Sequence, residues 1–447
     1  MSEFENACTG FSGRGFILAA PHSGSGKTTL TIGLLRALAR QGHAIQPAKV
    51  GPDYIDPQFH QVASGVPSLN LDGWAMRGET LSAFGEAMAT QPGLTVIEGV
   101  MGLFDGAVKS GVLGHGATAD LAKFLGLPVI LVVDCAGMGQ SVAALVKGFA
   151  SFDPDVQVAG VILNKLGSLR HVDMMTEALM KLGMPVIGAV TRSDEMELPS
   201  RHLGLVQAGE MADIEARIEL IADHVERSLD FDLLLGLAGQ FTGAVGARAE
   251  FCAAPAGVGP APIGQSIAVA SDEAFRFFYP HLKKAWLEAQ VSLSFFSPLA
   301  DEAPAKGADA IFLPGGYPEL YAGQLAGAGQ FRTGMKAAAE SGKVIYGECG
   351  GYMTLGDGLT DKNGQKHQML GLLQLETSFE TRKLHLGYRH VKACETGLTY
   401  RGHEFHYSTI CHEQGSPLYK DMDSETVYGL RDGSVAGSFI HLIDQAV

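Results

Sequence analysis

A glycine-rich segment near the N-terminus has the residue types of a phosphate-binding loop. The segment Ala20-Pro21-His22-Ser23-Gly24-Ser25-Gly26-Lys27-Thr28-Thr29 lies between an expected strand (15–20) and an expected helix (27–41). In such a turn the backbone N–H groups point at phosphate. Lys27 would reach the β and γ phosphates, and the Thr28 hydroxyl would hold Mg²⁺. We therefore predict an ATP site formed by Ser23, Gly24, Ser25, Gly26, Lys27, Thr28 and Thr29, although Pro21 replaces the first glycine of this motif.

Carboxylates follow two further expected strands, 45–50 and 94–100. Asp53 comes after the first of these strands, whereas Glu98 and Asp105 flank the end of the second. The carboxyl ends of parallel strands share one edge of an open sheet, where ligands bind. Hard cations such as Mg²⁺ prefer oxygen ligands. We expect these side chains to ligate a metal or to position a substrate beside ATP.

An Asn-Lys pair ends another hydrophobic strand, expected over 158–165. Asn164 and Lys165 resemble the pair that recognises the base in many nucleotide-binding P-loop proteins. We add Asn164 to the predicted nucleotide site on this basis.

The second half of the chain contains a cysteine with the surroundings of a nucleophile. Cys349 lies in Val344-Ile345-Tyr346-Gly347-Glu348-Cys349-Gly350-Gly351-Tyr352-Met353, where a strand enters a tight turn and leaves as a helix. This arrangement is the cysteine counterpart of the nucleophile elbow, and the helix N-terminus would favour the thiolate. Upstream, the backbone amides of Gly315 and Gly316 end another strand and could form an oxyanion hole.

A cysteine nucleophile needs a base, and three histidines are available for that role. His441 lies at the end of the last apparent strand, while His403 and His406 lie in Gly402-His403-Glu404-Phe405-His406. Spacing alone does not decide between them.

The elements that would position these residues form two α/β halves. Strands without polar alternation, separated by helices, indicate a parallel sheet covered on both faces. A Gly/Ala/Pro-rich stretch then separates this region from a second series of strands (266–270, 310–313 and 343–346), followed beyond residue 368 by an antiparallel extension. We predict a first domain over 1–240, a linker over 241–264 and a second domain over 265–447.

Composition excludes several classes of protein. The 447 residues are 46% hydrophobic and carry a formal charge of −15, which argues against disorder and against a broad nucleic-acid surface. The six cysteines are scattered without a C-x-x-C pair, as is usual in a reducing compartment. No window is apolar enough for a membrane helix. We expect a cytoplasmic enzyme with no membrane or nucleic-acid partner.

Taken together, the motifs are similar to those of one family, the glutamine-dependent a,c-diamide synthases of corrin (vitamin B12) biosynthesis. The resemblance covers nearly the whole chain. Besides the phosphate loop and the elbow, it rests on three segments: Gly51-Pro52-Asp53-Tyr54-Ile55-Asp56-Pro57, Glu98-Gly99-Val100-Met101-Gly102 and Leu198-Pro199-Ser200-Arg201-His202-Leu203-Gly204-Leu205.

The resemblance implies a P-loop synthetase domain similar to dethiobiotin synthetase and a class I glutamine amidotransferase domain. It implies that Cys349 and His441 release ammonia from L-glutamine, and that ATP activates acetate carboxylates of a corrin as acyl phosphates. Mg²⁺ would be held by Thr28, Asp53 and Glu98. The substrate site would comprise Asp53, Tyr54, Ile55, Asp105, Arg192, Arg201 and His202. A homodimer is also expected.

One position departs from the amidotransferase pattern. Other members of that class carry glutamate two residues after the histidine, but here that position is Ile443, and Asp444 is no obvious substitute. A Cys349–His441 dyad is therefore expected.

Several alternatives remain open from sequence. The corrin could be hydrogenobyrinic acid, which the segment Ala20–Lys27 and Tyr54-Ile55 favour, or cobalt-containing cobyrinic acid; a nickel tetrapyrrole and the related cobyric acid synthase fit less well. The first half alone would also suit a P-loop switch ATPase or metallochaperone, but a switch needs no glutaminase.

Overall fold

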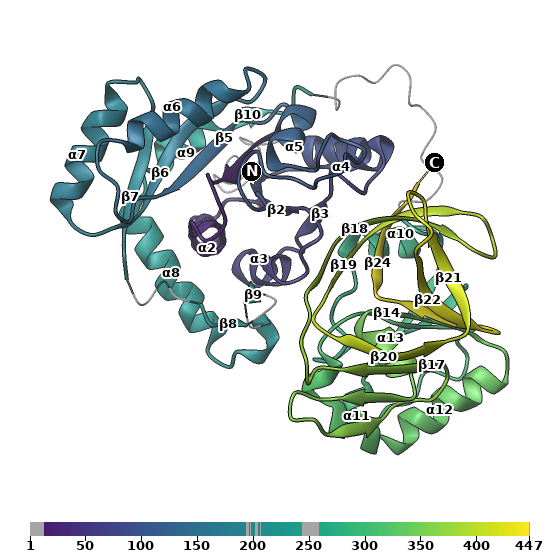
Figure 1. Ribbon diagram of the computed structural model, residues 1–447. Helices are drawn as coiled ribbons and strands as arrows, with labels where there is room; N and C mark the ends of the chain where they lie inside the picture. The colour runs from purple at the N-terminus through teal and green to yellow at the C-terminus, as the bar shows by residue number, and fades with distance from the viewer. Residues whose placement is uncertain are drawn as a thin grey trace, which may run out of the picture. The chain divides into compact units, whose positions relative to one another are not determined.

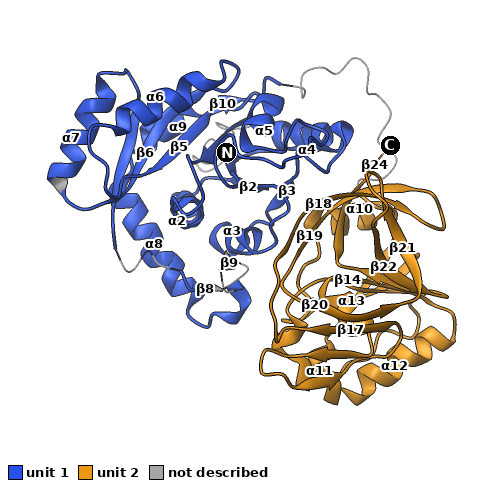
Figure 2. Ribbon diagram, viewed as in Figure 1, with its two compact units in different colours: residues 1–254 blue, residues 255–447 orange. Residues whose placement is uncertain are grey.

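The computed structural model describes residues 13–193, 196, 198–201, 204–205, 207–243 and 259–446. The chain divides into two compact units, 1–254 and 255–447 (Figure 2). Most of the predicted linker, residues 244–258, lies outside the described residues. Its last part belongs to the second unit, because the Gly259 N–H donates to Asp444 Oδ1 and the Trp286 indole N–H donates to the Pro260 carbonyl.

The first unit is built on an eight-stranded sheet in the order β3-β2-β4-β1-β5-β6-β7, with β10 pairing antiparallel to β1 (Figure 1). Its strands are β1 (Arg14–Ala19), β2 (Ile45–Val50), β3 (Leu69–Leu71), β4 (Leu94–Glu98), β5 (Val129–Asp134), β6 (Val158–Leu166), β7 (Val186–Thr191) and β10 (Gly239–Gln240). The seven strands on the main path pair parallel, so their carboxyl ends share one edge. This arrangement confirms the predicted parallel α/β architecture.

Helices follow most strands of this sheet. They are α2 (Lys27–Arg40), α3 (Asp56–Ser64), α4 (Gly78–Thr90), α5 (Thr118–Leu125), α6 (Val142–Phe152), α7 (Leu169–Met180), α8 (Ile214–Ser228) and α9 (Phe231–Leu237), with a small β8 (Ser200–Arg201) and β9 (Gly204–Leu205) hairpin and the 3-10 turn η2 (Ala208–Glu210). The helix α2, which begins directly after the phosphate loop, is fastened to α8 by ion pairs from Arg36 and Arg40 to Glu215, Glu219 and Asp223. The loop is thus mounted on a fixed helix.

The second unit contains a ten-stranded sheet in the order β12-β11-β13-β14-β23-β22-β21-β18-β19-β24. Its strands are β11 (Ser266–Ala270), β12 (Ser292–Phe296), β13 (Ala310–Leu313), β14 (Val344–Glu348), β18 (His385–Ala393), β19 (Thr399–His406), β21 (Ser416–Asp421), β22 (Val427–Asp432), β23 (Val435–Ser438) and β24 (Ile440–Ala446). The strands β11 to β14 and β23 pair parallel, and β18, β19, β21, β22 and β24 extend the sheet antiparallel.

Shorter elements complete this unit. They are α10 (Pro280–Glu288), η4 (Pro298–Ala300), η5 (Pro318–Leu320), α11 (Ala322–Gly327), α12 (Gly329–Glu340), α13 (Gly350–Leu355) and a four-stranded sheet of β15 (Gly358–Thr360), β16 (Lys366–Gln368), β17 (Gln374–Ser378) and β20 (Thr409–Gln414). The antiparallel extension expected beyond residue 368 is only partly uniform, because β17 pairs parallel with β15 while pairing antiparallel with β20.

Two further findings concern the cysteines and the helices. Within the described part of the chain, Cys135, Cys349, Cys394 and Cys411 are free thiols, and the other two cysteines lie outside it. None of the described helices combines the length and the apolar character needed to cross a membrane.

Candidate functional site

The predicted phosphate loop joins β1 to α2 and is held in place by the end of β6. Gly26 has φ 89°, and a Cβ there would lie 2.3 Å from Asn164 Nδ2, so glycine is required for both conformation and space. Asn164 Nδ2 donates to the Ser25 carbonyl (2.8 Å), and Lys165 Nζ donates to the Gly24 carbonyl (2.6 Å). Asn164 therefore does lie at the loop, with its amide nitrogen bracing the loop.

Lys27 is the first residue of α2 and is buried. Its Nζ donates to the Met101 carbonyl, 2.5 Å away, in the loop after β4. Burial lowers the pKa of Lys27 to about 8, partly opposed by the negative charge of Glu98. The lysine therefore sits between the phosphate loop and the acidic segment that follows β4.

Five side chains from three strand ends meet beside Lys27. Thr28 Oγ1 donates to Glu98 Oε1 (2.5 Å) and lies 3.3 Å from Asp56 Oδ2. Lys49 Nζ bridges Asp56 Oδ2 (2.6 Å) and Glu98 Oε1 (2.9 Å). His60 Nε2 lies 2.6 Å from Glu98 Oε2. Hydroxyl and carboxylate oxygens, the ligands that Mg²⁺ prefers, thus converge at the edge of the sheet.

The electrostatics of this cluster follow from its burial and its mixed charges. Burial disfavours charged Lys49, yet Asp56 and Glu98 outweigh burial and raise the lysine's pKa above its ordinary value. Burial also opposes ionisation of Glu98, but Lys49 and His60 hold its pKa well below the usual range. Burial, followed by the charge of Asp53, raises the pKa of Asp56 to about 7. Glu98 therefore stays ionised at neutral pH, whereas Asp56 is easier to protonate.

The other acidic candidates lie close by in different settings. Asp53 Oδ1 accepts the N–H groups of Ile55 (2.7 Å) and Asp56 (3.1 Å), forming an Asx turn that leads into α3. Tyr54 is half-buried and Ile55 is buried. Asp105 is exposed, and its Oδ2 accepts the Gly102 N–H at 3.1 Å. Asp56, which was not predicted, contacts Thr28 more directly than Asp53 does.

The structure describes the basic candidates only in part. Arg192 is exposed and follows β7 at the same edge of the sheet, where its N–H donates to the Leu166 carbonyl. Arg201 belongs to β8, and its side chain is not among those described; His202 lies outside the described residues.

In the second unit, Cys349 occupies a strained turn between β14 and α13. Its backbone has φ 47° and ψ −100°, a region that non-glycine residues rarely adopt. The Cys349 N–H donates to the Ser438 carbonyl at 2.8 Å. A Cβ at Gly350 would lie 2.9 Å from the Gly316 nitrogen, so the predicted oxyanion segment passes directly beside the elbow. The geometry is that of a nucleophile elbow.

The thiol of Cys349 is not in a thiolate-stabilising environment. The side chain is 4% exposed, and burial, followed by the charge of Glu319, raises its pKa above the ordinary range. The expectation that the helix N-terminus would favour the thiolate is thus wrong for this structure, because desolvation outweighs the hydrogen bond from Gly350. A neighbouring base must therefore take the thiol proton.

His441 is placed to be that base. It lies on β24, three residues after the Ser438 carbonyl that holds the elbow, and is buried. A Cβ at Gly315 would lie 2.3 Å from His441 Cε1, so glycine is required for the imidazole to fit against the oxyanion segment. Glu348 contacts the histidine from the other strand, with Oε2 3.6 Å from His441 Nδ1.

The two competing histidines have other environments. His403 lies opposite His441 in the β19–β24 register, and burial lowers its pKa to about 3. Both ring nitrogens of His406 are engaged, Nε2 with Glu404 Oε1 (2.9 Å) and Nδ1 with Ser408 Oγ (2.9 Å). These contacts favour His441 as the base.

The potential metal ligands around His406 make a poor metal site. Ligand atoms of His385, Glu404 and His406 lie within 4.8 Å of one another. The two imidazole rings stack with only 5° between their planes, so their in-plane lone pairs do not converge on one point, and Arg389 pairs with Glu404 at 2.6 Å. We interpret the group as a hydrogen-bonded network.

Sequence reasoning missed four residues that contact the predicted ones: Lys49, Asp56, His60 and Glu348. Two of them lie in or beside sequence motifs that the prediction already used. Asp56 lies within the quoted segment after β2, and Glu348 directly precedes Cys349. Lys49 and His60 had no signal of their own, since one ends a strand and the other lies within a helix.

Comparison with known proteins places each unit in a recognised family of domains. Residues 16–206 match the CobQ/CobB/MinD/ParA nucleotide binding domain, and residues 266–446 match the CobB/CobQ-like glutamine amidotransferase domain. The two matches correspond to the phosphate-loop unit and the Cys349 unit.

Curated relatives match along nearly the whole chain. A hydrogenobyrinate a,c-diamide synthase of Brucella anthropi is 52% identical over 442 residues, covering 96% of this chain and 98% of the relative. Enzymes of the same name from Sinorhizobium sp. and Mesorhizobium japonicum are 51% and 46% identical, each covering 97% of this chain and 99% of the relative. The resemblance inferred from motifs is confirmed at this level.

Proposed function

Because this chain belongs to the hydrogenobyrinate a,c-diamide synthase family, we propose that it amidates the a and c acetate carboxylates of hydrogenobyrinic acid, using ATP and L-glutamine. One observation carries the proposal: a single chain combines a phosphate loop facing an acidic cluster with a Cys349 elbow and a His441 imidazole that both lie against the segment Gly315-Gly316. The first arrangement suits activation of a carboxylate, and the second suits release of ammonia.

The glutaminase half begins with a proton transfer. His441 takes the thiol proton of Cys349 as the sulfur attacks the carboxamide carbon of glutamine, and the amides of Gly315 and Gly316 stabilise the oxyanion. The imidazolium returns the proton to the leaving nitrogen, which departs as ammonia and leaves a thioester. Water then attacks the thioester carbon, releases glutamate and restores the thiol.

The synthetase half consumes that ammonia. An acetate carboxylate oxygen attacks the γ-phosphorus of ATP, and ADP leaves. Lys27 neutralises the charge that develops on the transferred phosphoryl group. Ammonia then attacks the acyl carbon, phosphate leaves, and the amide loses a proton. The cycle repeats at the second acetate.

We propose Mg²⁺ as the metal of this half, because the donor set fits it. The Thr28 hydroxyl oxygen lies 2.5 Å from Glu98 Oε1 and 3.3 Å from Asp56 Oδ2, so three hard oxygens are close together. Asp53 accepts the Asp56 N–H and lies beside them. When bound, the ion would offset negative charge on the phosphates. Lys49 and His60 would orient Glu98 from behind.

The substrate is a polyanion, so the acidic protein needs local cations to bind it. Arg192, exposed at the carboxyl edge of the sheet, and Arg201 and His202 in the β8–β9 region are proposed for this role. Asp53, Tyr54, Ile55 and Asp105 would shape the same edge. The scattered cysteines and the use of ATP suit a cytoplasmic enzyme, and we retain the homodimer as a proposal.

Turnover with defined corrins tests the function. Purified enzyme is given ATP, Mg²⁺ and glutamine with either metal-free hydrogenobyrinic acid or cobyrinic acid, and amides are counted by mass. We expect two amides on the metal-free substrate. Two amides only on the cobalt-containing substrate would move the enzyme to the other branch. ATP hydrolysis that glutamine does not stimulate, with no amidated product, would support a switch ATPase instead.

A further inference from the structure

We propose that Glu348, the residue directly before the nucleophile, is the carboxylate that positions His441 and completes a Cys349–His441–Glu348 site. The inference deepens the proposed function and rests on its glutaminase half. It replaces the acid that related amidotransferases were expected to carry two residues after the histidine, where this chain has Ile443.

The carboxylate of Glu348 lies near Nδ1 of His441, the ring nitrogen that is not needed to take the thiol proton. Glu348 Oε2 lies 3.6 Å from His441 Nδ1, and its other oxygen accepts the Leu442 N–H at 3.1 Å. The first distance is slightly too long for a hydrogen bond, but contacts of catalytic bases are often long until charge develops in the reaction. Nδ1 directed at a carboxylate leaves Nε2 for the substrate and the thiol.

The acid nearest to the expected position is engaged elsewhere. The residue two positions after His441, Ile443, is apolar, and a β-bulge in the β19–β24 pairing sets Asp444 opposite Arg401 rather than opposite His403, the residue that faces His441. Asp444 Oδ1 accepts the N–H groups of Gly259 (3.1 Å) and Gln445 (2.9 Å), which commits it to anchoring the start of the unit. Glu348 reaches the histidine from a different strand, β14, through the pairing of β14 with β23.

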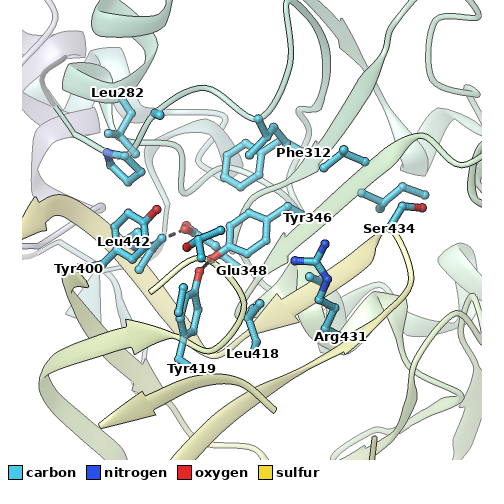
Figure 3. Close-up of a pocket in the computed structure, with 18 of the residues that line it drawn as sticks. Leu282, Phe312, Tyr346, Glu348, Tyr400, Leu418, Tyr419, Arg431, Ser434 and Leu442 are labelled. Carbon is cyan, nitrogen blue, oxygen red and sulfur yellow. Dashed lines mark hydrogen bonds between the residues drawn. The ribbon is translucent and has the colours of Figure 1, made fainter. Parts of the chain in front are cut away.

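Burial makes the charge of Glu348 effective. The side chain is 3% exposed and forms part of the wall of a cavity of about 190 Å³, among Phe312, Tyr346, Leu418 and Leu442 (Figure 3). Figure 3 shows its carboxylate near the rings of Tyr346, Tyr400 and Tyr419 as well as these apolar side chains. In such surroundings, a carboxylate stabilises a nearby imidazolium more than it would in water.

Other ionisable groups near His441 do not take this role. His403, opposite it on β19, has a pKa lowered to about 3 and stays neutral at working pH. Glu404, also on β19, is paired with Arg389 and His406. Glu319, in η5, contributes to the raised pKa of Cys349.

The test compares Glu348→Gln with wild type in the glutaminase reaction, measured as glutamate formed across a range of pH. Glutamine can still accept the Leu442 N–H through its side-chain oxygen, so the substitution removes the charge and keeps the structural hydrogen bond. We expect kcat to fall about 10²-fold, since general acid–base catalysis contributes about 10²–10⁴, with KM nearly unchanged.

The pH profile separates positioning from a structural role. A carboxylate favours the protonated form of a neighbouring imidazole, and Glu348→Gln removes that carboxylate. Because the neutral imidazole is the base, the acidic limb of kcat/KM should move to lower pH in Glu348→Gln. Glu348→Asp, which keeps the charge at a shorter reach, should recover part of kcat and return the limb towards wild type. Glu376→Gln, whose carboxylate pairs with Lys366 at 2.7 Å, is the matched control and should leave both unchanged.

The possible outcomes distinguish a failure of the inference about Glu348 from a failure of the proposed function. A folded Glu348→Gln with wild-type kcat and limb overturns the inference, as does a fall in kcat with an unmoved limb. If that variant does not fold, Glu348→Asp with wild-type kcat and limb overturns it equally. A wild-type enzyme without glutaminase activity would instead overturn the proposed function, which distinguishes the two failures.

Discussion

Replacing Lys27 by alanine should remove synthesis while leaving the fold and the glutaminase intact. Lys27 is 7% exposed, and its Nζ donates a hydrogen bond to the Met101 carbonyl. Loss of one hydrogen bond costs about 0.5–1.5 kcal/mol, and relief of the buried charge partly offsets that cost. A preorganised cation on a transferring phosphoryl group is worth about 10²–10³ in kcat, or roughly 2.7–4 kcal/mol. The catalytic effect should therefore clearly exceed the effect on stability.

The assay measures ADP and amidated corrin with glutamine as donor, and glutamate release in the same samples. We expect at least a ~10²-fold fall in ADP and amide formation, with glutaminase activity near wild type. Lys123→Ala is the control, because Lys123 lies in the same unit but pairs with Asp153 (2.9 Å) on the surface. That variant should lose neither activity.

One result would refute the reasoning about this loop. If folded Lys27→Ala formed amides at the wild-type rate, the nucleotide would not be activated at this lysine. A loss of glutaminase equal to the loss of synthesis, again in a folded variant, would show that the two activities are not carried by separate groups of residues.

The remaining predictions concern both halves of the reaction. Cys349→Ser should lose glutamine-dependent amidation but keep synthesis from ammonium salt, since a hydroxyl is a far weaker nucleophile; use of glutamine at the wild-type rate would exclude Cys349 as the nucleophile. Gly26→Ala should abolish ATP binding, measured by calorimetry, because its Cβ would lie 2.3 Å from Asn164 Nδ2; Gly42→Ala, with a similar φ of 81° and open space around it, should bind ATP normally. Chelation of divalent cations should stop synthesis but not glutaminase activity, and Mg²⁺ should restore it; synthesis that survives chelation would argue against the metal.

The motifs that were predictable from sequence are local ones. The phosphate loop needs glycine at Gly26, and the elbow needs small residues around Cys349, so each leaves a mark within about ten residues of chain. Parallel strands were predictable for a similar reason, since they are buried on both faces and appear as continuous apolar runs.

Partnerships between segments were not predictable. Lys49 and Glu98 meet only because β2 and β4 are neighbours in the sheet, with Lys49 opposite Glu98 in register. Nothing near Lys49 distinguishes it from a solvated lysine. The same holds for Glu348, whose contact with His441 depends on the pairing of β14 with β23.

Burial was the other quantity hidden from the sequence. The helix N-terminus after Cys349 predicted a thiolate, but the sign of the shift is set by desolvation, which depends on everything packed around the sulfur. Likewise, Asp53 had the expected position, yet the turn into α3 engages one of its oxygens and brings Asp56 to Thr28.

The backbone of Cys349 has a consequence for how this protein can change over generations. A non-glycine residue held at φ 47° and ψ −100° costs on the order of 1–3 kcal/mol, and glycine would adopt the same conformation at less cost. Cys349→Gly should therefore make the enzyme harder to melt while making it unable to use glutamine. A laboratory selection for heat resistance alone would favour that loss, so an evolving population keeps the cysteine only while growth depends on glutamine as the nitrogen donor.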